Sequence, residues 1–411
     1  MTHRTTIAIV AALTAVFVAA CAPAGPQPNR TAAPSPTSGA QTPTPTPSPA
    51  PTPQQTLTAD AVAFVSSLHG MEVGSTCAST CAIRVAITDT AGTTWGPSVA
   101  VATLPVSGGA SPSAVLGVRF QGDNAWIFGP NVYESHDDGH TWRQTLSGPV
   151  LALEPYENEV WAVTGCSAQD SAGCRPRLML SPAASDAWSL ASPQPDLALS
   201  IAAASAPFVV MERAPHGVTF LAQNTVPPPG QPGGQAVRSE GQLLFTSNNL
   251  GRSWQRLHAP CSEIQSLRSN DGVHVWVLCS VPCCTGNYVK SLWTSADGGH
   301  SWTERSGTDP RQTGSIPFSG SAEALTVTQA GVGVFGGSGS GGIWRSSDSG
   351  VTWRQAWTDE CIEGGNAVSE TWFATPLDGW AVTSDTADPR CPTLLHSING
   401  GVTWSGLPSP F

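Results

Sequence analysis

An eight-residue motif that ends in tryptophan recurs along this chain of 411 residues and constrains its fold more than any other feature. The strongest copies read SHDDGHTW at 135–142, SADGGHSW at 295–302 and SSDSGVTW at 346–353. Two copies carry asparagine in place of aspartate, at 247–254 and 397–404, and two weaker copies lie at 88–95 and 181–188. The closing tryptophans are Trp95, Trp142, Trp188, Trp254, Trp302, Trp353 and Trp404. A recurrence of this kind is typical of propellers and solenoids, so we expect seven similar units.

The residues of the motif are suited to a tight turn. Asp, Asn and Ser side chains accept hydrogen bonds from nearby backbone amides, and Gly adopts a positive φ without a steric penalty. The closing Trp supplies a large apolar surface for packing. We therefore expect the acids of the motif to shape the turns, and we predict no catalytic or metal-binding role for them.

Strand-like segments between the motifs complete each unit. Apolar runs such as AWIF at 125–128, VWAV at 160–163 and WAV at 380–382 follow polar turns. Four strands fit in each period, so the chain is predicted to be an all-β, seven-bladed β-propeller of four-stranded antiparallel blades. The first blade begins near Ala61 and the last ends at 403–407, so closure of the ring by an exchanged strand is not expected.

The motif resembles the Asp-box, or BNR repeat, of sialidases and related β-propellers, and the resemblance covers residues 57–411. In that family the box is the hairpin between the third and fourth strands of each blade. The same superfamily includes propellers that assist photosystem II assembly and are not enzymes. The resemblance therefore implies either a binding or assembly module or a protein that acts on glycans.

The catalytic residues of sialidases are not evident in this sequence. That family uses three arginines, a Tyr–Glu nucleophile, an acid/base Asp and an Arg-Ile-Pro motif, and this chain lacks the last. We do not expect Tyr133, Tyr156 or Tyr288 to act as a nucleophile in the inner channel. We predict a non-catalytic binding or assembly module without a cofactor, with a sialidase-like glycoside hydrolase or a polysaccharide-binding protein as the alternative.

The first 56 residues predict export and a tether. Residues 1–20 contain an apolar stretch at 7–20 that is too short for a membrane-spanning helix, which needs about 20 residues. The stretch ends in VAAC, which resembles the lipobox of bacterial lipoproteins and implies a lipid on Cys21; an ordinary cleaved signal with a chance cysteine is the alternative. Residues 21–56 are rich in Pro and Thr and predict a disordered tether before the propeller at 57–411. We expect the chain on the outer face of the cytoplasmic membrane, held there by the lipid alone.

The cysteines predict disulfides on one face of the propeller. Of eleven cysteines, ten remain once Cys21 is assigned to the lipid, and an even number in an exported chain favours bridges. Strand parity places them on the face opposite the motifs. The expected bridges are Cys77–Cys81, Cys166–Cys174 and Cys361–Cys391, with Cys261 and Cys279 bound to Cys283 and Cys284 in an order left open. A zinc site within 279–284 is the rival interpretation, but we expect no metal.

The cysteine-rich face is also where we expect a ligand. The candidate side chains are Asp170, Arg175, Arg177, Arg238, Asp388 and Arg390, and the further acids in possible positions are Glu240 and Asp385. A Pro- and Gly-rich segment at 226–234 is either part of this site or a tolerated surface insertion. The net charge of −11 does not favour nucleic acid. We therefore expect an envelope protein or a glycan as the partner.

Overall fold

The computed structural model describes most of the propeller. The described residues are 58–105, 116–165, 175–197, 209–224, 242–284, 287–309, 311–312, 314–318, 320, 324–329, 331–337, 342–358, 368–383 and 392–411. The expected signal peptide, Cys21 and tether lie outside them, within residues 1–57. A compact unit runs from Gln54 to Phe411.

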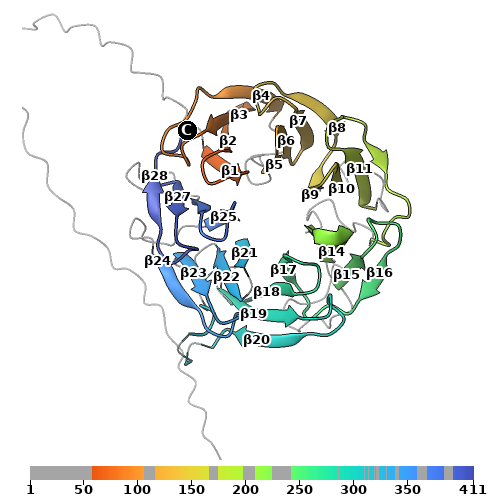
Figure 1. Cartoon of the computed structure of the whole chain (residues 1–411), viewed down its shortest axis with the longest axis vertical. Helices are drawn as coiled ribbons and strands as arrows, with labels where there is room; N and C mark the ends of the chain where they lie inside the picture. The colour runs from red at the N-terminus through yellow and green to blue at the C-terminus, as the bar shows by residue number, and fades with distance from the viewer. Residues whose placement is uncertain are drawn as a thin grey trace, which may run out of the picture. The chain divides into compact units, whose positions relative to one another are not determined.

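In the described part of the chain, seven antiparallel sheets of four strands surround a central axis (Figure 1). Blades 1 to 4 consist of β1 (Thr58–Phe64), β2 (Gly70–Cys77), β3 (Thr80–Thr88) and β4 (Val99–Pro105); β5 (Gly117–Gln121), β6 (Asn124–Phe128), β7 (Asn131–Ser135) and β8 (Arg143–Ser147); β9 (Val150–Tyr156), β10 (Glu159–Thr164), β11 (Arg177–Pro182) and β12 (Ser189–Leu190); β13 (Val209–Ala214), β14 (Val218–Asn224), β15 (Gln242–Ser247) and β16 (Gln255–Leu257). Blades 5 to 7 consist of β17 (Ile264–Arg268), β18 (Val275–Cys284), β19 (Asn287–Ser295) and β20 (Thr303–Gly307); β21 (Ala324–Gln329), β22 (Val332–Gly336), β23 (Gly342–Ser346) and β24 (Arg354–Thr358); β25 (Val368–Phe373), β26 (Gly379–Thr383), β27 (Leu394–Ser397) and β28 (Ser405–Leu407). A 3₁₀ turn at Pro215–Gly217 joins β13 to β14. The predicted all-β, seven-bladed fold is confirmed.

Strands pair in chain order within each blade, so the first strand lies at the centre of the ring and the fourth at its rim (Figure 1). The second strands are buried along nearly their whole length, as in β22 and β26, because neighbouring blades cover both of their faces. Trp126, Trp161 and Trp380 on such strands are fully buried. Among the described residues, no helix is long and apolar enough to cross a bilayer.

The eight-residue motifs form the turns between the third and fourth strands. The hydroxyl of the first motif residue accepts the amide of the glycine four positions later, as from Gly139 to Ser135 at 2.9 Å. The motif acid Asp137 accepts from the amide of Thr141 at 2.8 Å and from its hydroxyl at 2.7 Å. These hydrogen bonds lower the pKa of Asp137 to about 2. The acids of the motif therefore shape the turn, as expected.

Two successive residues of each regular turn adopt left-handed backbone angles. In blade 2 these are Asp138, with φ of 60°, and Gly139, with φ of 77°. The equivalent residues of the other regular turns are Ala91 and Gly92, Leu250 and Gly251, Gly298 and Gly299, Ser349 and Gly350, and Gly400 and Gly401. A Cβ on Gly251 would lie 2.4 Å from the ring of Trp161 in the preceding blade, so this glycine also permits close blade packing.

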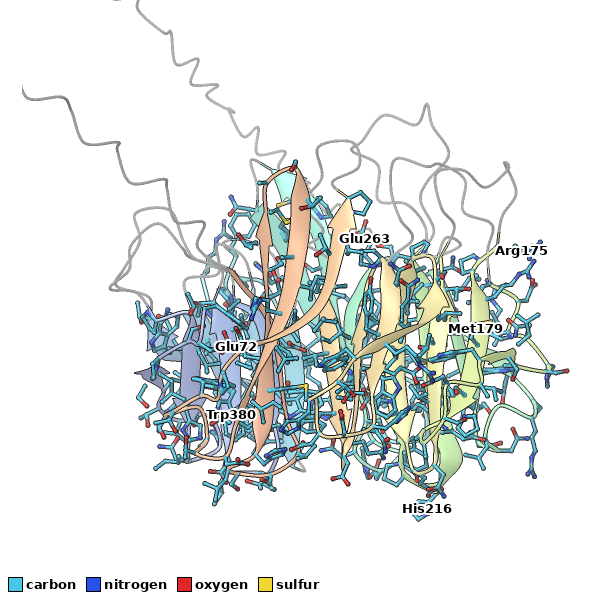
Figure 2. All side chains as sticks on the ribbon, turned by 90° about the horizontal axis from the view of Figure 1, so that it is seen from above. Glu72, Arg175, Met179, His216, Glu263 and Trp380 are labelled. Atoms are coloured by element: carbon cyan, nitrogen blue, oxygen red, sulfur yellow. A yellow bond between two sulfur atoms is a disulfide. The ribbon has the colours of Figure 1, made fainter. Side chains whose placement is uncertain are left out.

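The left-handed geometry joins two turns on one face of each blade. The amide of Asp138 donates to the carbonyl of Asp123, in the turn between β5 and β6, at 3.0 Å. The equivalent bond in blade 6 runs from Ser349 to Gly331 at 2.9 Å, and blades 1, 4, 5 and 7 repeat it. We call the face that carries these turns the motif face and the opposite one the disulfide face. In Figure 2, His216 lies at the motif face, and Arg175 and Glu263 lie toward the disulfide face.

The weak third motif, at 181–188, forms a different turn. The hydroxyl of Ser181 donates to the carbonyl of Ser185 at 2.6 Å, in place of accepting a glycine amide. Ala183, one position earlier than in the other blades, donates its amide to Asn158. The loss of the glycine therefore changes the turn but keeps its link to the first-to-second-strand turn.

Blade 7 packs on blade 1 without an exchanged strand, as expected. The rings of Phe64 and Trp380 stack with their centroids 3.6 Å apart. Trp372 donates its Nε1 proton to the carbonyl of Phe64 at 2.8 Å, and Trp95 donates to Pro408 at 2.8 Å. Side-chain contacts and the C-terminal segment therefore hold the ends of the ring together.

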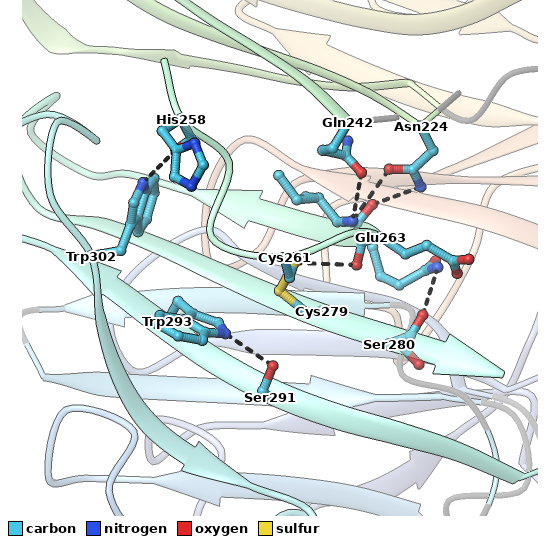
Figure 3. The surroundings of a disulfide bond; sticks show 12 residues. Asn224, Gln242, His258, Cys261, Glu263, Cys279, Ser280, Ser291, Trp293 and Trp302 are labelled. Carbon is cyan, nitrogen blue, oxygen red and sulfur yellow. Dashed lines mark hydrogen bonds between the residues drawn. A yellow bond between two sulfur atoms is a disulfide. The ribbon is translucent and has the colours of Figure 1, made fainter. Parts of the chain in front are cut away.

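Two disulfides are present among the described residues, and both lie at the disulfide face. Cys77–Cys81 closes the connection between β2 and β3, as predicted. Cys261 is bound to Cys279 (Figure 3), so the predicted pairing of both residues with Cys283 and Cys284 is wrong. Because Cys279 forms this bridge, the rival zinc site at 279–284 is not supported.

Strand register explains this correction. Cys279 pairs with Ile264 between β18 and β17, which places it beside Cys261 with a Cα–Cα distance of 6.4 Å. Cys283 lies four residues farther along β18, and at about 3.3 Å per residue this exceeds the reach of a disulfide. Its thiol donates to the carbonyl of Asn287 instead. Cys166, Cys174, Cys361 and Cys391 lie outside the described residues, so their pairings stay predictions.

Replacing the first residue of a motif should destabilise the propeller. Ser346→Ala removes the acceptor for the buried amide of Gly350, so we expect the free energy of unfolding to fall by about 1–3 kcal/mol. Ser347→Ala, at the neighbouring exposed position, should change it by less than about 0.5 kcal/mol. Urea denaturation of both variants tests this, and equal effects would show that the hydroxyl does not organise the turn.

Candidate functional site

Ionisable side chains from the first strands of five blades line the central channel. Arg119 comes from β5, Glu154 from β9, Glu212 from β13, Arg268 from β17 and Glu370 from β25. Together with neighbouring residues they line a cavity of about 340 Å³. We call these five side chains the channel ring.

The pleat of the first strands directs these side chains inward. Successive residues of a strand point to opposite faces, and Val118 and Phe120, on either side of Arg119, are buried in the hydrophobic core. Arg119 must therefore point away from that core. The first strands contact one another around the whole ring, including β25 with β1, so their inward side chains converge.

Arg119 holds two carboxylates of the channel ring. Its Nη2 lies 2.6 Å from Oε1 of Glu154, and its Nη1 lies 3.6 Å from Oε1 of Glu370. The guanidinium also lies over the ring of Trp372, 5.7 Å from the centroid. Burial disfavours the charge on Arg119, but the two carboxylates outweigh burial and raise its pKa. Arg119 is therefore a fixed cation between two acids.

Glu212 and Arg268 form the second part of the channel ring. Nη1 of Arg268 lies 3.5 Å from Oε2 of Glu212, and the amide of Ser269 donates to Oε1 at 3.2 Å. Burial raises the pKa of Glu212 to about 7, and nearby Glu154 adds to the increase although Arg268 opposes it. Glu212 therefore takes up a proton more readily than an exposed glutamate, and burial likewise raises the pKa of Glu370.

The cavity extends toward the motif face. Its lining continues from Glu370 along β25 into residues 373–376, in the turn before β26, and it includes Asn270 in the turn before β18. Turns between first and second strands lie at the motif face. The ligand was expected on the opposite face; that expectation stays a prediction, because most of its candidate residues lie outside the described part of the chain.

The predicted ligand residues do not join the channel ring where they can be placed. Arg175 is exposed and its Nη1 lies 2.9 Å from Oδ1 of Asp196, near the disulfide face (Figure 2). Arg177 is also exposed, at the start of β11. The remaining candidates, Asp170, Arg238, Glu240, Asp385, Asp388 and Arg390, lie outside the described residues.

Among the described residues, no tyrosine lines the channel cavity. Tyr133 is buried and accepts a hydrogen bond from Asn131, while the guanidinium of Arg213 covers Tyr156 at 5.2 Å from the centroid. Tyr288 lies on the third strand of blade 5, as expected. The described lining of the cavity therefore contains no tyrosine of the kind that the sialidase mechanism uses.

The channel ring was not predicted from the sequence, because each of its members is an isolated charged residue in a short apolar strand. Successive members lie far apart along the chain, at positions 119, 154, 212, 268 and 370. They therefore form no local cluster in the sequence. A usable signal does exist: the first strands GVRFQ, VVMERA and VSETWF each carry a charge among residues that are otherwise suited to a core. In a propeller that position faces the axis.

Comparison with known proteins identifies the fold and no family. No protein-family model and no curated protein match the chain. YCF48 from Cyanidioschyzon merolae is similar in structure, with a TM-score of 0.50 and 17% identity over 82% of this chain and 95% of that one. An ulvan lyase, a polysaccharide lyase solved with -[GlcA(1-4)Rha3S]-, has a TM-score of 0.54 and 9% identity over 86% and 98%. Acylaminoacyl peptidase from Pyrococcus horikoshii has a TM-score of 0.51 and 8% identity over 86% and 53%. Proteins of such different kinds share the fold, so similarity alone does not assign an activity.

Removing the shared cation of the channel ring should destabilise the protein. Arg119→Met leaves Glu154 and Glu370 without their partner at sites that are about four-fifths buried, so we expect the free energy of unfolding to fall by about 3–5 kcal/mol. Arg175→Met breaks an exposed ion pair and should lower it by at most about 1 kcal/mol. Chemical denaturation measures both, and similar losses would mean that the channel charges are screened by water.

Proposed function

We propose that this chain is a lipid-anchored, extracytoplasmic propeller that acts as a non-catalytic binding or assembly module. The observation that supports this proposal best is the mutual pairing of charges in the channel ring. Each glutamate contacts an arginine, and Glu370 and Glu212 also accept a backbone amide. The ring therefore presents fixed donors and acceptors to a ligand.

A glycosidase needs a different arrangement of its acids. One carboxylic acid must donate a proton to the leaving oxygen while a second carboxylate, about 5–10 Å away, attacks or activates water. Glu154 and Glu370 both contact Arg119, and burial raises the pKa of Glu370 although that cation opposes the increase. The same guanidinium engages both acids, which does not match the two separate roles that a glycosidase requires.

The channel ring is suited to a polar partner. Its three carboxylates and two guanidinium groups surround a cavity of about 340 Å³ that reaches the motif face. Ligand pockets of this size, with a few well-placed polar groups, hold small molecules or short polymer segments. We propose an envelope protein or a glycan as the partner. It would bind where the channel opens at the motif face, which we call the channel mouth.

The proposed location rests on the cysteines. Disulfides are typical of oxidising compartments outside the cytoplasm, and two are present among the described residues. The resemblance of residues 18–21 to a lipobox adds the proposed anchor at Cys21.

A second candidate is an enzyme that acts on polysaccharides. It is favoured by the convergence of Glu154 and Glu370 on Arg119 beside Trp372, since acids next to an aromatic ring are typical of sugar-binding clefts. Glu212, whose pKa is raised to about 7, and Glu370, whose pKa burial also raises, are the acids of the channel ring suited to donate a proton.

Capture from the organism's own envelope tests the binding proposal. Arg268→Glu reverses a charge at the channel mouth, and we expect it to abolish recovery of the partner that the wild-type chain retains after cross-linking. Arg175→Glu makes the same change near the disulfide face and should retain the partner. Quantitative mass spectrometry of the captured material measures both.

The same variants distinguish the enzyme. If the purified wild-type chain releases reducing ends or unsaturated sugars from envelope polysaccharides and Glu212→Gln does not, the non-catalytic proposal is wrong. Loss of the partner in Arg175→Glu and not in Arg268→Glu would instead move the binding site to the disulfide face.

The anchor has its own test. Wild-type chain should incorporate a labelled fatty acid and begin at residue 21, whereas Cys21→Ser should carry no label because the acceptor thiol is gone. Cys283→Ser is the matched control and should be labelled like the wild type. Fluorography and N-terminal peptide mapping provide the measurements, and a label that persists in Cys21→Ser contradicts lipidation at this residue.

A further inference from the structure

A cluster of three metal-ligating side chains lies between blades 2 and 3, away from the central channel. Glu134 lies on β7, next to the motif turn. His136 is the second residue of the motif at 135–142, and Asp186 belongs to the weak motif at 181–188. One ligand atom from each lies within 4.8 Å of the others. They border an open cavity of about 370 Å³.

Glu134 directs an unpartnered oxygen into this cluster. Its side chain is only 1% exposed, and its Oε1 accepts from Trp188 at 2.7 Å and from Thr145 at 2.8 Å. Its Oε2 has no hydrogen-bond partner and lies 3.8 Å from Nε2 of His136. A buried carboxylate oxygen without a hydrogen bond is unfavourable, and a cation bound in the cluster would stabilise it in addition to the charge that Arg143 already contributes.

The ring of His136 is held in an orientation suited to a metal ligand. Its Nδ1 lies 2.7 Å from Oδ1 of Asn124, and because an amide oxygen only accepts, Nδ1 carries a proton. Nε2 faces Oδ1 of Asp186 at 3.0 Å, and it would be the ligand atom of the ring once it has given up its proton. Metal-binding histidines usually donate their other nitrogen to an oxygen in this way, which fixes the ring orientation.

Asp186 completes the set in the same manner. Its Oδ1 lies 3.0 Å from Nε2 of His136, and its Oδ2 contacts Arg143. In all three ligand residues, therefore, one polar atom is held by a neighbour and the other faces the cluster. A protonated His136 would satisfy Asp186, but Oε2 of Glu134 would stay without a hydrogen bond.

We propose that Oε2 of Glu134, Nε2 of His136 and Oδ1 of Asp186 bind one Zn²⁺ across the junction of blades 2 and 3. Nitrogen and carboxylate oxygen are ligands that Zn²⁺ accepts at about 2.0–2.2 Å, and a site with three protein ligands leaves the fourth position to water. The open cavity provides room for that water. Small side-chain rotations bring the three ligand atoms to these distances.

In this proposal the weak third motif provides one of the metal ligands. It lacks the glycine and the acid of the regular turn, and Asp186 stands at its sixth position, where the other copies carry Thr93, His140, Arg252, His300, Val351 and Val402. The irregular turn places this acid against the preceding blade. A metal there would add a link between two blades that also meet through the ion pairs of Arg119 with Glu154 and of Arg143 with Asp186.

Calorimetric titration with Zn²⁺ tests the site in the purified full chain after treatment with a chelator. We expect one Zn²⁺ per chain and a rise in the melting temperature on binding. His136→Ala should weaken the affinity at least tenfold, whereas His300→Ala, at an exposed histidine in a regular motif of blade 5, should leave it unchanged.

Two further variants separate binding from folding. Glu134→Gln keeps an oxygen for Trp188 and Thr145 but removes the charge, so it should fold and lose the melting-temperature rise. Asn124→Ala removes the partner of Nδ1 and should weaken zinc binding by about 10–100-fold. If the wild-type chain shows no saturable zinc binding, or if His136→Ala and Glu134→Gln bind like the wild type, the proposal is overturned. These results do not depend on the channel ring, so they leave the proposed function untouched.

Discussion

The pair of left-handed residues in each regular motif turn is the constraint on which the propeller depends. It directs the amide of the fourth motif residue toward the turn between the first two strands of the same blade. It also favours glycine at the fifth motif position. Because glycine has no side chain, Gly139, Gly251 and Gly350 can approach the preceding blade closely. One backbone conformation therefore organises the inside of a blade and the contact between blades.

Convergence of the first strands then decides the chemistry at the axis. Apolar groups on the outward side of these strands fill the core, while the inward side chains meet their counterparts from other blades. In this protein those counterparts include three acids and two bases, and burial alone would make each of them unfavourable. Pairing of Arg119 with Glu154 and Glu370, and of Arg268 with Glu212, resolves the conflict.

The fold was predictable because the motif is local and repeated. Eight residues with Ser or Thr first, Trp last and, in six of the seven copies, Gly at the fifth position recur along the chain, and seven copies specify a ring. The channel ring and the zinc cluster were not predictable in this way, since Arg119 meets Glu370 only through ring closure. Cys261 illustrates the same limit: sequence spacing placed it in the right group of cysteines, but only the register of β17 on β18 decides that its partner is Cys279.

Closure of the ring by side chains has a mechanical consequence. A propeller with an exchanged strand resists pulling on its terminus through a ladder of hydrogen bonds. Here the first strand of the ring, β1, meets β25, so tension applied at the start of β1 would act directly on the contact between the first and last blades. This tension would be resisted by the stacked rings of Phe64 and Trp380 and by the hydrogen bond from Trp95 to the carbonyl of Pro408.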